Sequence, residues 1–292
     1  MQAGSIRNFI GANPVSIAEF RYQRFVIKRG KVGGLWILLA AAMVVPALIT
    51  AFVLTVVMLF ADPLLPIIFE TLQTFDESTA QTLTGIGNLL VTSLLISNLA
   101  LYPVVTLVTM SLSANSIRRE KHGFTWDTLR LTEIGAWRIV TGKWRASLQA
   151  LNGDHIMMTL LRSGLLAVYL LFNYVLVIAS TPDISAPPMG YSLAMLILLI
   201  LTLIYGALDA ALTAALGIPG MLPDETAGTI MGALTMSLRI AAGAGAVTWT
   251  ALSVHVMIYH GFAAIGLLSI IGIMTYLLLI TGALLLARWL VK

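Results

Sequence analysis

The chain has 292 residues, of which 59% are hydrophobic and only 10% charged, and its net charge is +4. A soluble domain carries charge on roughly a quarter of its residues, so this composition excludes an ordinary soluble protein. The absence of cysteine excludes disulfides, thiolate zinc sites and thiol catalysis. The basic residues lie beside apolar runs, where membrane orientation explains them, so nucleic acid is not an expected partner.

The first 34 residues are polar and basic, and they precede the first long apolar run. Asn13-Pro14 is typical of a helix start, because Asn can cap a helix and Pro fits its first turn. In the sequence that follows, Phe20 and Phe25 alternate with basic residues at helical spacing. We therefore expect residues 1–34 to form a cytoplasmic N-terminus whose amphipathic helix lies in the inner membrane interface.

Residues 35–292 are expected to form a domain of six transmembrane helices. Each apolar run is close to the roughly 20 residues that cross a bilayer as a helix. The runs show no period of two, so they are predicted to be helices and not strands of a barrel. They cover residues 35–60, 83–112, 163–181, 191–216, 240–259 and 263–287.

The charges orient these six helices. With the N-terminus inside, all 17 Lys and Arg residues lie on the cytoplasmic side: in the first 34 residues, in 118–162, at Arg239 and in the tail at 288–292. The longer outer loops carry acidic residues and no basic one, as the positive-inside rule requires. We predict an all-α, multi-pass protein of the cell membrane with both termini in the cytoplasm and cytoplasmic loops at about 113–162 and 217–239.

Polar residues recur inside the second predicted span. Thr84, Asn88 and Thr92 are four residues apart and share one helix face, and Asn98 follows. Asn173 lies in the third span. Such residues either bond neighbouring helices or line a translocation path. Asn88, Thr92, Asn98 and Asn173 are the candidates for the second role.

A dense polar segment, residues 114–145, interrupts the apolar pattern after the second span. A chain embedded in lipid has little reason to carry it unless something in the water contacts it. Residues 126–131 are amphipathic if helical, Gly135 interrupts them, and residues 137–140 restart an apolar pattern that leads to Gly142-Lys143. We expect two short helices joined by a tight bend, a shape that fits a groove on a soluble partner.

Motifs of membrane-embedded enzymes are absent from the sequence. It contains no His-Glu-x-x-His, no Gly-x-Ser-x-Gly and no phosphate-binding loop, and its four histidines are scattered. We therefore predict no catalytic residue, no cofactor-binding residue and no metal ligand in this chain, and we do not expect an enzyme.

A longer pattern runs through the polar segment. Its residues are Glu120, Lys121, Thr125, Leu129, Thr132, Ile139, Gly142 and Lys143. This spacing resembles the end of the second span in the membrane subunits of ABC-2 type transporters, and Asn13-Pro14-Val15 with Glu19-Phe20-Arg21 is similar to that family's interfacial helix. There are departures: Gly123 stands one position early, Glu133 replaces a proline, and residues 144–162 are an additional stretch before the third span.

In that family the first cytoplasmic loop carries a coupling helix that sits in a cleft of a separate ATP-binding subunit. The resemblance implies a permease subunit of an exporter that forms a homo- or heterodimer, with ATP and Mg bound by the partner and no cofactor in this chain. Glu120 would end the second span as a polar or salt-bridging hinge, and Gly142-Lys143 would begin the return to the membrane. The implied docking and coupling residues are Glu120, Thr125, Trp126, Leu129, Thr132, Ile134, Trp137, Gly142 and Lys143.

Two alternatives stay open at the level of sequence. The chain could be a non-transporting scaffold or accessory subunit of a larger membrane complex, an interpretation that the departures favour slightly. The polar segment could also be an amphipathic loop that binds anionic lipid headgroups. The expected partners are accordingly an ABC ATP-binding subunit, a second permease subunit and membrane lipids.

Overall fold

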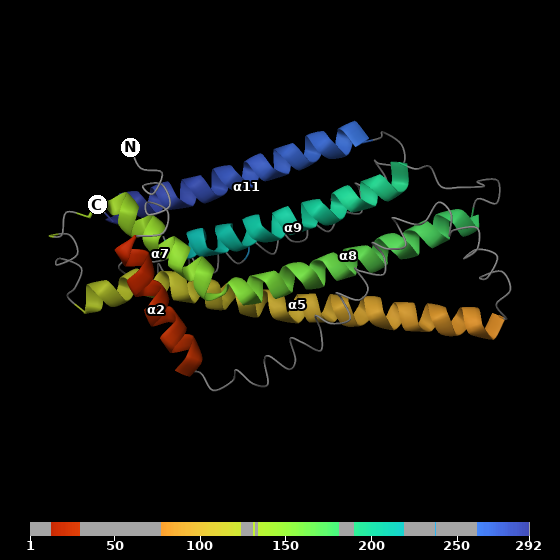
Figure 1. Cartoon of the computed structure of the whole chain (residues 1–292), viewed down its shortest axis with the longest axis horizontal. Coiled ribbons are helices and arrows are strands. Elements are labelled where there is room, and N and C mark those ends of the chain that lie inside the picture. The colour runs from red at the N-terminus through yellow and green to blue at the C-terminus, as the bar shows by residue number, and fades with distance from the viewer. Residues whose placement is uncertain are drawn as a thin grey trace, which may run out of the picture. The chain divides into compact units, whose positions relative to one another are not determined.

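A computed structural model of the chain describes residues 13–29, 77–123, 131, 134–180, 190–218, 237 and 262–291. Regular secondary structure within these residues is entirely helical (Figure 1). The helices are α2 (Pro14–Arg29), α5 (Glu77–His122), α7 (Ala136–Ala150), α8 (Asn152–Ser180), α9 (Gly190–Gly217) and α11 (Phe262–Val291).

Three of these helices are long and apolar enough to cross a membrane, so the chain is a membrane protein. The stretches are Val91–Glu120 in α5, Ile197–Gly217 in α9 and Ser269–Leu290 in α11. They overlap the second, fourth and sixth predicted spans. The predicted spans at 35–60 and 240–259 lie outside the described residues.

Helix α5 extends well beyond the predicted span at 83–112. It has 46 residues, and at 1.5 Å per residue it is about 69 Å long, more than twice the hydrocarbon thickness of a bilayer. Pro103 lies inside it without ending it. The helix continues through Ser113 and Ser116, which are both about 1% exposed, because this end is packed against other segments.

Most of the predicted loop at 113–162 is helical. Residues 113–122 complete α5, residues 136–150 form α7, and residues 152–162 begin α8, which continues through most of the third predicted span. The stretch at 144–162, expected as an addition before that span, is therefore divided between two helices that meet at Leu151. Gly135 precedes α7 as its N-cap, which confirms the break predicted at that glycine.

The chain divides into two compact units. The first contains Met1–Lys31, Val104–His155 and Ala207–Lys292, and the second contains Val32–Pro103 and Ile156–Gly206. Its long helices contribute residues to both units.

The core of the first unit lies where α7, the end of α9 and α11 meet. Its buried residues are small or branched apolar side chains: Val140, Leu212, Ala215, Ile218, Ile280, Ala283, Leu284 and Ala287. The Trp144 indole donates a hydrogen bond to the Ala211 carbonyl across 2.9 Å, which fixes α7 on α9. On α9, Gly217 packs so closely on Met110 and Ser113 of α5 that an added Cβ would lie 2.6 Å from the Ser113 Cβ.

The second unit contains close contacts between α5, α8 and α9. The Arg162 guanidinium lies over the Tyr102 ring at 4.6 Å. Gly206 of α9 faces Thr159 of α8, and a Cβ at Gly206 would overlap that side chain. Small residues permit such close helix approach in membrane bundles, where van der Waals packing replaces the hydrophobic effect as the driving force.

Candidate functional site

Helix α2 begins as predicted at Asn13-Pro14. The Asn13 Oδ1 accepts a hydrogen bond from the Val15 N–H at 3.2 Å, which caps the helix start. The buried face of α2 is mainly polar: Val15, Ser16, Glu19 and Gln23 are at most 8% exposed. The protein interior on this side of α2 therefore has to satisfy polar groups.

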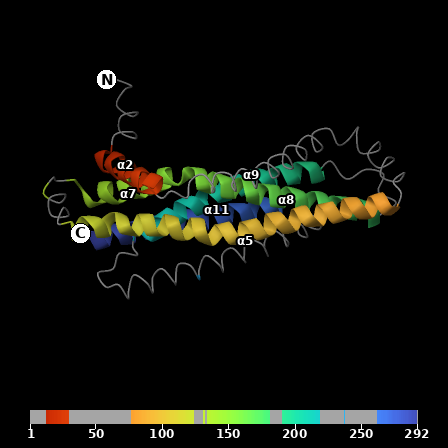
Figure 2. The same ribbon diagram turned by 90° about the horizontal axis from the view of Figure 1, so that it is seen from below.

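Helix α7 supplies the opposing surface and lies beside α2 (Figures 1 and 2). Its buried positions recur at three- and four-residue steps, the period of a helix with one packed face. They are Ile139, Val140, Gly142, Lys143, Ala146 and Ser147. Val140 belongs to the apolar core, and Lys143 and Ser147 bond to α2.

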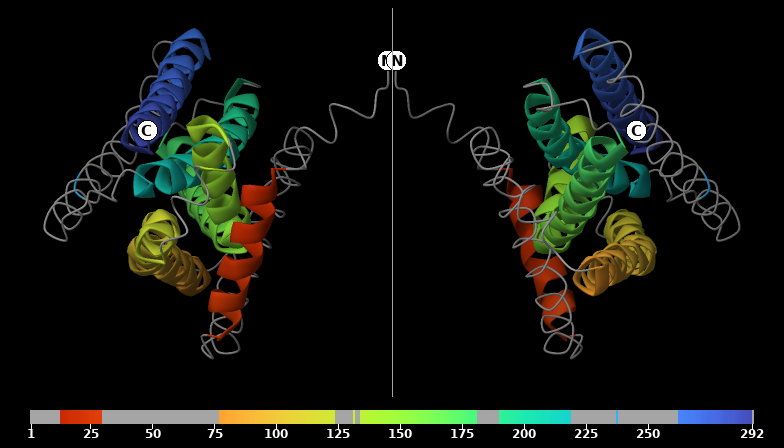
Figure 3. Two further views of the ribbon diagram at one scale, coloured as in Figure 1. Left: turned by 90° about the vertical axis from the view of Figure 1, so that its left-hand side faces the viewer. Right: turned by 90° about the vertical axis from the view of Figure 1, so that its right-hand side faces the viewer.

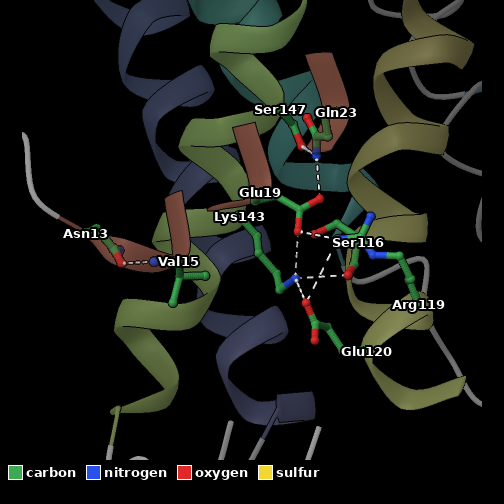
Figure 4. Close-up of polar contacts among 9 residues, drawn as sticks. All are labelled: Asn13, Val15, Glu19, Gln23, Ser116, Arg119, Glu120, Lys143 and Ser147. Atoms are coloured by element: carbon green, nitrogen blue, oxygen red, sulfur yellow. Dashed lines mark hydrogen bonds and ion pairs between the residues drawn. The ribbon is translucent and has the colours of Figure 1, made fainter. Parts of the chain in front are cut away.

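Four charged side chains from three segments meet between these helices and the end of α5 (Figure 4). They are Glu19 of α2, Arg119 and Glu120 of α5, and Lys143 of α7, and we call them the charged junction. The Lys143 Nζ lies 3.1 Å from the Glu19 carboxylate and 3.2 Å from that of Glu120. It also donates to the Ser116 carbonyl at 2.9 Å, so its three protons are all used.

Arg119 closes the junction on its outer side. Its Nη2 lies 2.8 Å from the Glu19 carboxylate and 3.9 Å from that of Glu120. Each glutamate is thus shared by both cations, and the four formal charges sum to zero. Exposure falls from 35% for Arg119 to 1% for Lys143, so the lysine is the member that water stabilises least.

Neighbouring polar groups hold the junction in position. Gln23 donates to the Glu19 Oε1 at 3.0 Å and to the Ser147 Oγ at 3.1 Å, joining α2 to α7 a turn beyond the ion pairs. The Arg119 guanidinium lies over the Tyr22 ring at 3.6 Å. A buried charge is tolerated when it is paired and its remaining hydrogen-bonding capacity is used, a condition that Lys143 meets.

Gly142 lets the start of α2 approach α7. The Asn13 Nδ2 donates to the Arg138 carbonyl at 2.8 Å. Residue 142 is one turn beyond that carbonyl, and a Cβ there would lie 2.7 Å from the Asn13 Nδ2 and 3.2 Å from the Val15 Cβ. The glycine leaves the space that the asparagine amide occupies.

The docking residues implied by the resemblance separate into two groups. Glu120 and Lys143 come together in the charged junction. Gly142 and Lys143 lie buried in the middle of α7, whereas the resemblance implied that they begin the return to the membrane. Trp137, near the start of α7, is 42% exposed. Leu131, which was not among the implied residues, is 81% exposed. Ile134 is partly buried. The remaining implied residues, Thr125, Trp126, Leu129 and Thr132, lie outside the described residues.

The candidates for a translocation path lie on helices α5 and α8. Asn88 and Thr92 are exposed, whereas Asn98 is buried and its Nδ2 donates to the Leu94 carbonyl of its own helix at 3.0 Å. The backbone of Asn173 lies in α8, and its side chain is outside the described part of the chain. A shared lining of these residues stays a prediction.

Three members of this arrangement were not predicted as site residues: Glu19, Gln23 and Arg119. One signal in the sequence points to the first, because Glu19 is the sole acid among the first 34 residues, which contain six basic ones. An isolated acid that shares a helix face with Gln23 is a candidate for an internal partner.

Comparisons of the chain with protein-family models, with curated proteins and with solved structures give no match. Among the described residues there is no group of His, Cys, Asp and Glu that could hold a metal ion. The charged junction connects three helices: α2, the end of α5, and α7 of the polar segment.

Proposed function

We propose that this chain is the permease subunit of an ATP-driven ABC-2 type transporter, coupled through its polar segment to a separate ATP-binding subunit. Three features support the proposal: the family-like spacing of the polar segment, the apolar helices α5, α9 and α11, and the exposed residues that precede and begin α7. ATP and Mg would bind in the partner. Two permease subunits would face each other in the membrane and export a solute by alternating access.

The observation that carries the proposal is the charged junction. A soluble partner that pushes on Leu131 and Trp137 would displace α7. Lys143 ties α7 directly to Glu120, which is the last residue of the apolar stretch Val91–Glu120 of α5. A displacement of α7 would therefore reach a membrane-crossing helix through a partly buried ion pair, which salt screens less than an exposed one.

A second candidate is a scaffold or accessory subunit that has this fold and does not transport. The course of residues 144–162 favours it, because α7 continues to Ala150 where the resemblance implies a return at Gly142-Lys143. In that case the charged junction would hold three segments together, and no movement of α7 would be passed to α5.

Cross-linking in the native membrane tests the partner. The chain has no cysteine, so Leu131→Cys and Trp137→Cys place a photoactivatable cross-linker at single sites. Gln149→Cys, exposed near the other end of α7, is the matched control. We expect the first two to capture a soluble ATP-binding subunit, identified by mass spectrometry. Capture of integral membrane subunits alone would replace the transporter proposal with the scaffold one.

The purified complex with its ATP-binding subunit then tests coupling. Spin labels at Leu131→Cys and at the exposed Leu99→Cys of α5 report on the polar segment and on the apolar helix. We expect ATP to change both signals in the otherwise unaltered chain. Adding Glu120→Ala should preserve assembly and the response at residue 131 and abolish that at residue 99. An unchanged response at residue 99 would contradict the role of Glu120 as a hinge.

A further inference from the structure

The surface of α2 that faces away from the charged junction is both apolar and basic. Ile17 and Phe25 are 43% and 56% exposed, and Arg21 lies between them on the same stripe of the helix. Arg24 is exposed one turn after Arg21, with its guanidinium 5.5 Å above the Phe20 ring. The inner face of α2 is mainly polar, and its outer face carries large exposed apolar side chains beside the arginines, whereas a helix on a soluble domain buries its apolar side chains.

The charged junction fixes the depth of α2 relative to α5. Glu19 pairs with Arg119, which together with Glu120 ends the apolar stretch Val91–Glu120. In Figure 3, α2 is seen along its length where the end of α5 is seen nearly end-on, so α2 runs crosswise to a helix that crosses the membrane. If α5 crosses the membrane along this stretch, a helix held crosswise at that level would lie at the boundary between hydrocarbon and water.

We infer that the outer face of α2 binds the anionic surface of the adjoining membrane leaflet, with Arg21 and Arg24 on lipid phosphates and Ile17 and Phe25 in the acyl boundary. Arginine offers several donors in a rigid fork that matches phosphate oxygens, and its aliphatic stem lies along apolar surface. An aromatic ring beside the guanidinium suits the same boundary. The occupant is therefore a lipid surface with negative headgroups, and lipid composition would set how firmly α2 is held.

This arrangement gives α2 two attachments of different kinds. Its inner face is held by buried ion pairs, and its outer face would be held by contacts that salt can screen. Each arginine near an anionic surface should change the ratio of attached to released helix by about fivefold. The inference goes beyond the transporter proposal and does not depend on an ATP-binding partner, so either can fail without the other.

The test uses the full chain in nanodiscs of phosphatidylcholine, or of equal parts phosphatidylcholine and phosphatidylglycerol. A nitroxide at Phe25→Cys reports its accessibility to oxygen, which concentrates in lipid, and to a water-soluble nickel chelate. Gly123→Cys, exposed just after α5, is the water-side reference. We expect the label at residue 25 to be oxygen-accessible in the anionic discs and to become nickel-accessible in neutral discs or at high salt.

Charge variants complete the test. In anionic discs, the double variant with Arg21→Gln and Arg24→Gln should make the label at residue 25 nickel-accessible, as it is in neutral discs. Arg138→Gln with Arg288→Gln removes the same charge from exposed positions outside α2 and should leave the label unchanged. Size-exclusion profiles and thermal unfolding confirm that both double variants are folded.

Three outcomes would overturn the inference. Nickel accessibility at residue 25 in both kinds of disc would show that α2 stands in water. Equal oxygen accessibility in both discs and in both double variants would show insertion without recognition of the headgroup charge. Protection from both reagents would show that protein, such as a second copy of this chain, covers the face.

Discussion

The hydrogen-bond donors of the charged junction and those farther back along α5 are satisfied in opposite ways. Lys143 bonds to groups from two other segments, more than 20 and more than 120 residues away in the sequence. Asn98 donates to its own helix one turn back, and Ser97 does the same. Both solutions pair polar groups away from water, but only the first ties segments to one another. A polar residue in a membrane helix is therefore informative about assembly only when its partner lies on another segment.

The largest expected effect is at the buried member of the junction. Lys143→Met keeps a long side chain but leaves two carboxylates facing each other with one cation fewer. Removing one partner of a buried ion pair costs about 3–5 kcal/mol, and Arg119 should keep the loss near the lower figure. The loss is measured as the difference in the free energy of unfolding in detergent between the variant and the unaltered chain.

Arg138→Met is the control for this change, because residue 138 is an exposed cation on the same helix as Lys143. Its expected cost is within about 0.5 kcal/mol, typical of surface positions. Equal costs for the two variants would contradict the assignment of Lys143 as a buried link.

An intermediate effect is expected where α2 and α7 touch. Gly142→Ala would bring a methyl group to 2.7 Å from the Asn13 amide nitrogen and 3.2 Å from the Val15 Cβ. Overpacking of this kind costs about 1–3 kcal/mol. Gly282→Ala, in open space on α11, should be neutral or stabilise its helix by up to about 1 kcal/mol. Thermal unfolding of both variants gives the comparison, and a neutral Gly142→Ala would mean that α2 lies farther from α7.

The smallest effect is expected at the locally bonded amide. Asn98→Leu removes a donor satisfied by its own helix and a buried Oδ1 that has no partner among the described residues. Stability should stay the same or rise by about 1 kcal/mol, because an unsatisfied polar atom disappears. Thr109→Val provides the contrast: its hydroxyl also contacts His155 of α8 at 3.1 Å, so a loss of about 0.6 kcal/mol is expected. A large loss at Asn98 in unfolding measurements would indicate a partner on another helix.

Local features of the fold were predictable from the sequence, and the pairing of segments was not. Asn13-Pro14 marks the start of α2 and Gly135 the start of α7 because caps and breaks depend on neighbouring residues. The contact of Glu19 with Lys143 depends on how two helices 124 residues apart lie against each other, which the periodicity of either helix does not specify. The resemblance implied that Gly142-Lys143 begins the return to the membrane. Helix α7 continues instead, because Gly142 accommodates Asn13 and the residues after it pack on α9 and α2.

The central claim is that Glu19 and Lys143 physically join the N-terminal helix to the polar segment. A double-mutant cycle tests it most directly: Glu19→Gln, Lys143→Met and the double variant, with the free energy of unfolding measured for each. The two side chains should show a coupling energy of about 1–3 kcal/mol, whereas a cycle of Glu19→Gln with Arg138→Met should be additive within about 0.5 kcal/mol. Additive behaviour of Glu19 and Lys143 would contradict the charged junction and, with it, the route from α7 to α5.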